Sequence, residues 1–540
     1  MLMIDVMEEP AEETVSEITH VLWYALESGN ATPERVKAHI EAGADVNYAD
    51  IFGDTVLMRA VRGQNTEVIR SLIEAGADVN ARYKRNIEAL AAKYPFSDMR
   101  DLCKAEGWTA LMEAVDSDCT PEVAKALLDA GADANAKYTV FTDSYWYEVS
   151  VLMIAADSNY HPEVAELLIS YGADVNFQDE YGYTPLSQAV KSNDADIMKI
   201  LLKAGADVGV RCHYEYNYGE YFTYDATYDA TLLMLATRYA SSEIIKILAE
   251  AGADIEAKDD FGDNALMWAV RHEIDEETYP DPDNVKALLA SGADVNARGN
   301  CGDTALIYSA SEGDTEMMQV LIDAGADLYA DNRWGRTALT EAASPEAIEI
   351  LLNSNFNINH RNSNGMTPLM QACYYGNGEA AKTLIKAGAD FCCGGFSVDD
   401  KNRTALMFAC SPYSGHPDIE TVQALINAKF YVNAKDDEGR TVLMYAVSCG
   451  SDPEVVKALI RAGANVNAKD SRLGKTILME AAMRARYPEA IKILIRAGAD
   501  IDAKDKIGST AKDYADLNPD SEIAGILDGL DANTGGNHHA

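Results

Sequence analysis

Few residues in this chain have both the type and the spacing that catalysis or metal binding needs. The acidic run Glu273–Glu277 could attract a cation, but it lacks the ligand spacing of a calcium-binding loop. Cys212 and His213 are adjacent, yet no second ligand pair follows at a zinc-site distance. The chain also contains no G-x-S-x-G, no glycine-rich phosphate loop with lysine and no H-E-x-x-H motif. The sequence therefore predicts a protein that is not an enzyme and that needs no cofactor or metal.

Aromatic residues point instead to binding. Two stretches, 138–147 and 214–224, alternate Tyr with Thr or Glu, a pattern typical of β-strands. Rigid, amphipathic aromatic side chains are enriched in contact surfaces. We therefore expect these stretches to extend as β-ribbons, with aromatic side chains on one face, and to contact a partner. The alternative is that the aromatic side chains pack on one another and keep the ribbons ordered.

The candidate partner-binding residues fall into four groups. The first stretch supplies Tyr138, Phe141, Tyr145, Trp146 and Tyr147, and the second supplies Tyr214, Tyr216, Tyr218, Tyr221, Phe222 and Tyr224. Turn tips, where an aromatic residue precedes a glycine, supply Phe52, Tyr181, Phe261 and Trp334. Predicted helices supply Trp268 and Tyr308, which we expect to lie near a concave face.

A recurring phrase identifies the elements that must hold these residues. The letters A-G-A-D-V-N stand at 42–47 and 75–80 and return, with small changes, along the whole chain. A second phrase, T-x-L-M, follows several copies, as at 55–58 and 404–407. The glycine pairs Gly43 and Gly76, and Gly172 and Gly205, are each 33 residues apart. A fixed period of this length is typical of a repeat array.

Each repeat reads as two short helices. Thr55 precedes an apolar run and can accept a hydrogen bond from a free N–H at the start of a helix. Residues 66–75 carry an apolar stripe, so they form the second helix. Gly76 ends that helix, because glycine adopts the left-handed conformation of a helix cap at little cost. Neither helix can bury its apolar face alone, so neighbouring repeats must stack.

This pattern resembles the ankyrin repeat family, whose motif runs D-x-x-G-x-T-P-L-H-x-A-A. The resemblance covers almost the whole chain and implies an all-α repeat solenoid of about 13–14 stacked units with β-hairpin fingers. The family's histidine is methionine in nine units, which we interpret as core filling. These are Met58, Met112, Met153, Met234, Met267, Met370, Met407, Met444 and Met479. Two units lack the turn glycine and have Asn355 or Lys429 there, so we expect local weakness.

We predict a single solenoid over residues 17–530, between a disordered acidic N-terminus (1–16) and a disordered tail (531–540). Insertions interrupt it at about 82–106, 137–149, 209–229, 272–284 and 391–400.

Composition limits the partners. The net charge of −42 disfavours direct nucleic acid binding and anionic membranes. No apolar run is long enough to cross a bilayer. Nine scattered cysteines and the lack of a signal peptide favour a cytoplasmic protein, with export independent of a signal left open.

The resemblance implies a scaffold that binds a protein partner, and we expect the chain to be monomeric on its own. The charge suggests an alternative, in which an acidic inhibitor or nucleic-acid mimic caps a basic protein surface. A third possibility is an effector delivered into another cell. The sequence does not choose among these roles or name the partner.

Overall fold

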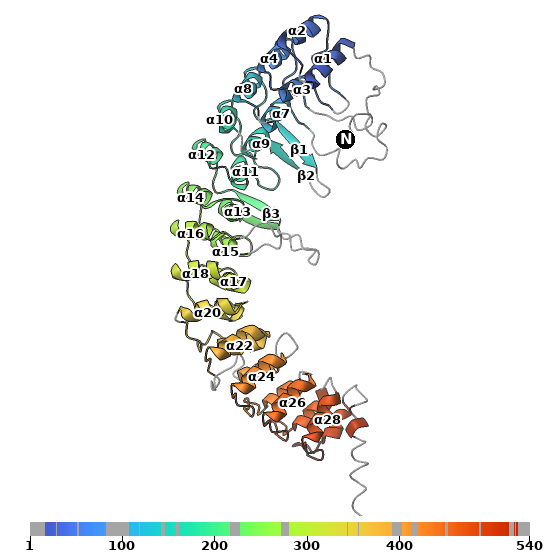
Figure 1. The fold of residues 1–540 in the computed structure, drawn as a ribbon, viewed down its shortest axis with the longest axis vertical. Coiled ribbons are helices and arrows are strands. Elements are labelled where there is room, and N and C mark those ends of the chain that lie inside the picture. The colour runs from blue at the N-terminus through green and yellow to red at the C-terminus, as the bar shows by residue number, and fades with distance from the viewer. Residues whose placement is uncertain are drawn as a thin grey trace, which may run out of the picture. The chain divides into compact units, whose positions relative to one another are not determined.

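The computed structural model describes residues 17–28, 30–50, 53–82, 107–117, 119–141, 146–157, 161–215, 227–271, 280–342, 344–354, 356–390, 402–411, 418–448, 452–484, 488–517, 523 and 525–527. Short helices alternate with turns and hairpins throughout these ranges, so the chain is an all-α repeat solenoid, as predicted (Figure 1). Two compact units can be distinguished, residues 1–260 with 273–292, and residues 261–272 with 293–540. The prediction of one continuous solenoid over 17–530 stays a prediction.

In the first unit, the first helices of the repeats pack on one another, and so do the second helices. The first helices are α1 (Glu17–Glu27), α3 (Val56–Arg62), α7 (Ala110–Asp116), α9 (Val151–Asp157), α11 (Pro185–Lys191) and α13 (Leu232–Tyr239). The second helices are α2 (Pro33–Glu41), α4 (Thr66–Glu74), α8 (Pro121–Asp129), α10 (Pro162–Ser170), α12 (Ala195–Lys203), α14 (Ser242–Glu250) and α16 (Pro282–Ala290).

The second unit has the same two rows. Its first helices are α15 (Ala265–Ala269), α17 (Ala305–Glu312), α19 (Ala338–Glu341), α21 (Pro368–Tyr375), α23 (Ala405–Ala409), α25 (Val442–Ser448), α27 (Ile477–Arg484) and α29 (Ala511–Ala515). Its second helices are α18 (Thr315–Asp323), α20 (Pro345–Asn353), α22 (Gly378–Lys386), α24 (Ile419–Asn427), α26 (Pro453–Arg461) and α28 (Pro488–Arg496).

The predicted helix signals are confirmed at atomic detail. The Thr55 hydroxyl accepts the backbone N–H of Met58 at 3.1 Å, at the start of α3. Gly76, just past the end of α4, has φ +92°. The nine methionines at the family's histidine position are all buried. In the capping box of α13 the sulfur of Met234 accepts the N–H of Thr231 at 3.3 Å, so methionine also supplies a cap bond there.

One of the two units without a turn glycine shows a strained backbone. Lys429 follows α24 with φ +65°, in the left-handed region that favours glycine. Asn355 lies outside the described residues.

A ladder of asparagine side chains ties many of the described repeats to the next. In every rung the carboxamide nitrogen donates to the carbonyl of the turn glycine of the next repeat, and the carboxamide oxygen accepts the backbone N–H two residues beyond that glycine. We call this set the asparagine ladder; its complete rungs in the described residues are Asn47, Asn80, Asn135 and Asn176 in the first unit and Asn296, Asn433 and Asn467 in the second.

Two insertions in the first unit form antiparallel hairpins, as the alternating pattern predicted. Strand β1 (Lys137–Phe141) pairs with β2 (Trp146–Ser150), and β3 (Arg211–Glu215) pairs with β4 (Thr227–Thr231). Both hairpins extend from the row of first helices (Figure 1). The predicted termini, and most of the insertions at 82–106, 272–284 and 391–400, lie outside the described residues.

Candidate functional site

The two hairpins are joined through the turn that lies between them in sequence. The backbone N–H of Glu148 in β2 donates to the carboxylate of Glu180 at 2.9 Å. On the other side, the N–H of His213 in β3 donates to the carbonyl of Tyr181 at 2.8 Å. We call β1–β2, the turn 178–183 and β3–β4 together the finger region. The two hairpins and the turn therefore form one hydrogen-bonded series in the first unit.

The junction between the turn and β3 requires a glycine. Gly182 has φ +81°, and a Cβ atom there would lie 2.3 Å from the carbonyl oxygen of Arg211. The thiol of Cys212 donates to the carbonyl of Gly182 at 3.5 Å. Burial raises the pKa of that thiol to about 12. This close approach brings β3 against the turn.

Asp179 shapes the turn itself. Its carboxylate accepts the backbone N–H groups of Tyr181 at 2.9 Å and Tyr183 at 2.8 Å. Burial nevertheless raises the pKa of Asp179 to about 6, because the charged form loses hydration that these two bonds only partly replace. A carboxyl group that titrates near neutral pH therefore lies at the centre of the finger region.

The two faces of the first hairpin differ. Alternation along β2 places Tyr147 and Trp146 on opposite faces, so the expectation that the aromatic side chains share one face is wrong for this pair. The ring of Tyr147 meets that of Tyr181 edge to face, 6.4 Å between centroids. Tyr138 packs in the same way on Trp108 at 4.7 Å. Burial raises the pKa of Tyr138 to about 12. Trp146, in contrast, is 52% exposed.

Outside the finger region the candidate residues divide by exposure. In the second unit Phe261 is 49% exposed and Trp334 46% exposed, each at the tip of its turn. Trp268 in α15 is only 3% exposed, so it offers little contact area to a partner in this conformation. Tyr308 in α17 is half-buried, and its hydroxyl donates to the carboxylate of Asp263 at 3.2 Å.

Most of the other candidate residues lie outside the part of the chain that the structure describes. Phe141 lies in β1 and Tyr214 lies in β3. Phe52, Tyr145, Tyr216, Tyr218, Tyr221, Phe222 and Tyr224 lie outside the described residues.

Sequence reasoning missed a recurrent polar group on the first helices of the second unit. The hydroxyl of Tyr445 donates to Asp436 at 2.8 Å, and Arg440 lies over the tyrosine ring, 4.8 Å from its centroid. Tyr514 and Asp505 repeat the hydroxyl–carboxylate bond at 2.7 Å. The signal for the first of these groups was Arg440, a basic residue directly before the threonine that precedes α25. Because these groups bond mainly to one another, they stabilise the repeats and offer no free nucleophile or base.

The described part of the chain contains no cluster of three or more His, Cys, Asp or Glu side chains arranged to hold a metal ion. None of its helices is long and apolar enough to cross a bilayer. Five cysteines within it are free thiols: Cys119, Cys212, Cys301, Cys373 and Cys410.

Comparison with known proteins agrees with the repeat architecture. The family model described as ankyrin repeats (3 copies) matches residues 22–138, 141–212, 276–362, 332–394, 394–470, 413–505 and 452–527. The single ankyrin repeat model matches residues 228–260.

Two similar proteins come from Acanthamoeba polyphaga mimivirus. The putative ankyrin repeat protein R841 is 49% identical over 47 residues, which is 9% of this chain and 8% of that protein. The putative ankyrin repeat protein R664 is 34% identical over 67 residues, 12% of this chain and 41% of that protein. The matched segments thus span less than half of either relative.

Proposed function

Because the chain belongs to the ankyrin repeat family, whose repeats generally mediate protein–protein interaction, we propose that it is a non-enzymatic scaffold that binds a protein partner through the finger region. The partner contacts the aromatic side chains of the two long hairpins first, and the concave face of the repeats completes the interface.

The observation that carries this proposal is the position of Trp146. Its side chain is 52% exposed at the start of β2, and the opposite face of the same strand is fixed by the contact of Tyr147 with Tyr181. A large aromatic side chain on a supported strand loses little conformational freedom when a partner covers it. Tryptophan is also enriched among the residues that dominate binding energy.

The remaining candidate residues have different roles in the proposed interface. Tyr138, Tyr147 and Tyr181 are partly covered, so they support Trp146 and add contact area at their edges. The aromatic residues of the second hairpin, from Tyr216 to Tyr224, are included in the proposed binding surface on the basis of their sequence pattern alone. Phe261 and Trp334 provide further exposed tips in the second unit. Trp268, being buried, acts only by shaping its helix.

The test begins with affinity capture from the native cell, using the full chain and a variant that lacks both long hairpins. A partner retained only by the full chain is then purified, and its affinity is measured by calorimetry. The double substitution Trp146→Ala and Phe222→Ala should cost about 2–4 kcal/mol of binding free energy, as expected for central anchors. Folding, followed by circular dichroism, should not change.

Tyr431→Ala is the matched control, because Tyr431 is a 72% exposed aromatic residue that the proposal does not use. It should leave the affinity unchanged. Wild-type affinity in the double variant would refute the proposal. Unfolding of the double variant would favour the alternative in which these side chains only keep the hairpins ordered.

The net charge of −42 favours a second candidate, an acidic inhibitor that caps a basic protein surface. The two candidates differ in salt dependence. Binding between charged surfaces weakens steeply as the ionic strength rises, whereas aromatic anchoring depends on it only weakly. Affinity measured between 50 mM and 500 mM salt separates them.

A further inference from the structure

Two positions of the first unit, Gly209 and Glu256, lack the asparagine of the ladder, and only Gly209 has no side chain there. Gly209 stands two residues after Asp207, where the preceding repeat has Asn176 two residues after Asp174. The same hydrogen bond holds the backbone at both positions. The N–H of Gly209 donates to the carboxylate of Asp207 at 2.8 Å, and the N–H of Asn176 donates to that of Asp174 at 3.0 Å. The repeat thus keeps the turn of a ladder rung but lacks the side chain.

The missing side chain leaves two backbone groups of the next repeat without their usual partners. In the preceding rung the Asn176 carboxamide bonds the carbonyl of Gly205 at 3.1 Å and the N–H of Asp207 at 2.8 Å. The equivalent groups one repeat later are the carbonyl of Gly252 and the N–H of Asp254. Within the described residues neither has a hydrogen-bond partner.

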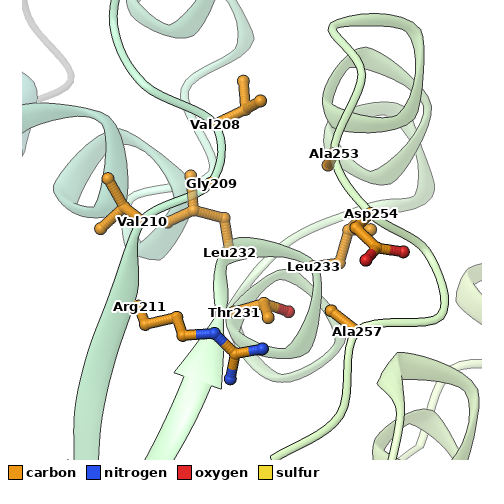
Figure 2. Close-up of a pocket in the computed structure, with 10 residues that line it drawn as sticks. All are labelled: Val208, Gly209, Val210, Arg211, Thr231, Leu232, Leu233, Ala253, Asp254 and Ala257. Carbon is orange, nitrogen blue, oxygen red and sulfur yellow. The ribbon is translucent and has the colours of Figure 1, made fainter.

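A cavity of about 190 Å³ lies at the same place. Figure 2 shows the segment 208–211 on one side and Ala253, Asp254 and Ala257 on the other. Leu232 and Leu233 of α13 also line the cavity. A Cβ atom added to Gly209 would have only the Asp207 carboxylate within 4 Å, at 3.2 Å, so the space beyond it is open.

Hydrogen-bonding chemistry limits which chemical groups could occupy the cavity. An occupant that pairs with both backbone groups must place one acceptor at the N–H and one donor at the carbonyl, with the spacing that the Asn176 carboxamide has at the equivalent groups. A carboxylate only accepts and would also face the carboxylates of Asp207 and Asp254, whereas a guanidinium only donates. A primary carboxamide supplies both, as the asparagines of the ladder demonstrate.

We propose that the cavity beside Gly209 binds a primary carboxamide, supplied by a Gln or Asn side chain of the partner polypeptide. The site adjoins β3 and β4, so such a side chain would enter at the base of the second hairpin. The inference rests on the proposed function only for the source of the side chain, and its chemistry is tested without any partner.

The test follows the backbone amide resonance of Asp254 by NMR in the full chain labelled with ¹⁵N-aspartate. The probe is an acetylated Gly-Gln-Gly peptide with an N-methylamide end, compared with the same peptide carrying Glu in place of Gln. The Gln peptide should shift the Asp254 resonance saturably, with an affinity at least ten times that of the Glu peptide. The backbone amide of Asp207 is already hydrogen-bonded to Asn176, so its chemical shift should not change. No saturable shift, or equal shifts with both peptides, would overturn the proposal.

Two variants locate the site. Gly209→Asn rebuilds the rung and should abolish the response, while Gly209→Ala leaves most of the cavity open and should keep it. An equal loss of the peptide response in both variants would count against the proposal. If Gly209→Asn does not fold, the difference in affinity between the Gln and Glu peptides for the wild-type chain decides. The last part of the experiment is a titration with acetamide. If it binds as tightly as the Gln peptide, the site takes free amides, and the assignment to a polypeptide side chain is wrong.

Discussion

The side-chain oxygen of Asn176 accepts the backbone N–H of Asp207 at 2.8 Å, across 31 positions of sequence. The same carboxamide donates to the carbonyl of Gly205 at 3.1 Å. Both bonds cross from one repeat to the next, so they contribute directly to the stacking on which a repeat array depends.

Asn176→Ala should therefore lower the free energy of unfolding by about 1–2 kcal/mol, the usual contribution of one or two hydrogen bonds that water can partly replace. Urea titration followed by circular dichroism measures this. Gln178→Ala, at an exposed position two residues after Asn176, serves as the control and should change little. If the two variants were equally stable, the ladder would contribute nothing to stacking.

Replacing the strained residue Lys429 should instead raise the free energy of unfolding. Its φ of +65° costs a residue with a Cβ atom about 1–2 kcal/mol, whereas glycines such as Gly463 occupy the equivalent turn freely. Lys429→Gly should stabilise the chain by about 0.5–1 kcal/mol, because the greater freedom of glycine in the unfolded state offsets part of the gain.

Lys429→Ala separates this cause from the loss of charge, since alanine keeps the Cβ atom. It should give no gain in the urea midpoint. An equal gain in both variants would show that the lysine charge, and not the backbone conformation, is responsible.

Residues whose role is local were predictable from the sequence, and residues whose role depends on the next repeat were less so. Thr55 and Gly76 act within their own helices, and both have the predicted conformations. Trp268 was expected to project near the concave face but is buried, because side chains from other parts of the fold pack around it. The ladder went unnoticed because its partners lie at varied separations, 29 positions for Asn47 and 51 for Asn80. The aromatic stretch at 138–147 predicted a hairpin, and strand alternation alone separates Trp146 from Tyr147, but the contact of Tyr147 with Tyr181 depends on the neighbouring turn.

The buried thiol of Cys212 should be chemically inert in the folded protein. Burial raises its pKa to about 12, so at pH 8 almost none of it is the reactive thiolate. Cys301, which is partly exposed, is the internal comparison. Brief treatment with iodoacetamide and mass spectrometry should show at least tenfold less alkylation at Cys212 than at Cys301, and the difference should vanish in urea. Equal labelling of the native protein would mean that β3 opens readily from the turn.

The final prediction concerns the effect of pH on the finger region, through Asp179. The pKa of this carboxyl group is raised to about 6 in the folded chain, from an ordinary value of 3.8, mainly by burial. Folding therefore favours the protonated form. The corresponding stability is fully present below pH 4 and is lost as the pH rises through about 6.

Asp179→Asn removes this titration and keeps an oxygen that can accept the N–H groups of Tyr181 and Tyr183. At pH 7.5 the variant should be more stable than the wild-type chain by about 1–2 kcal/mol, a value reduced from the full shift because the side chain is only partly buried. The advantage should shrink as the pH falls and be absent at pH 4. Thermal melting of both proteins across this range is the measurement, and Asp174→Asn, on the exposed turn of the same repeat, is the control for general charge. An advantage that does not depend on pH would show that the carboxylate is not the group responsible.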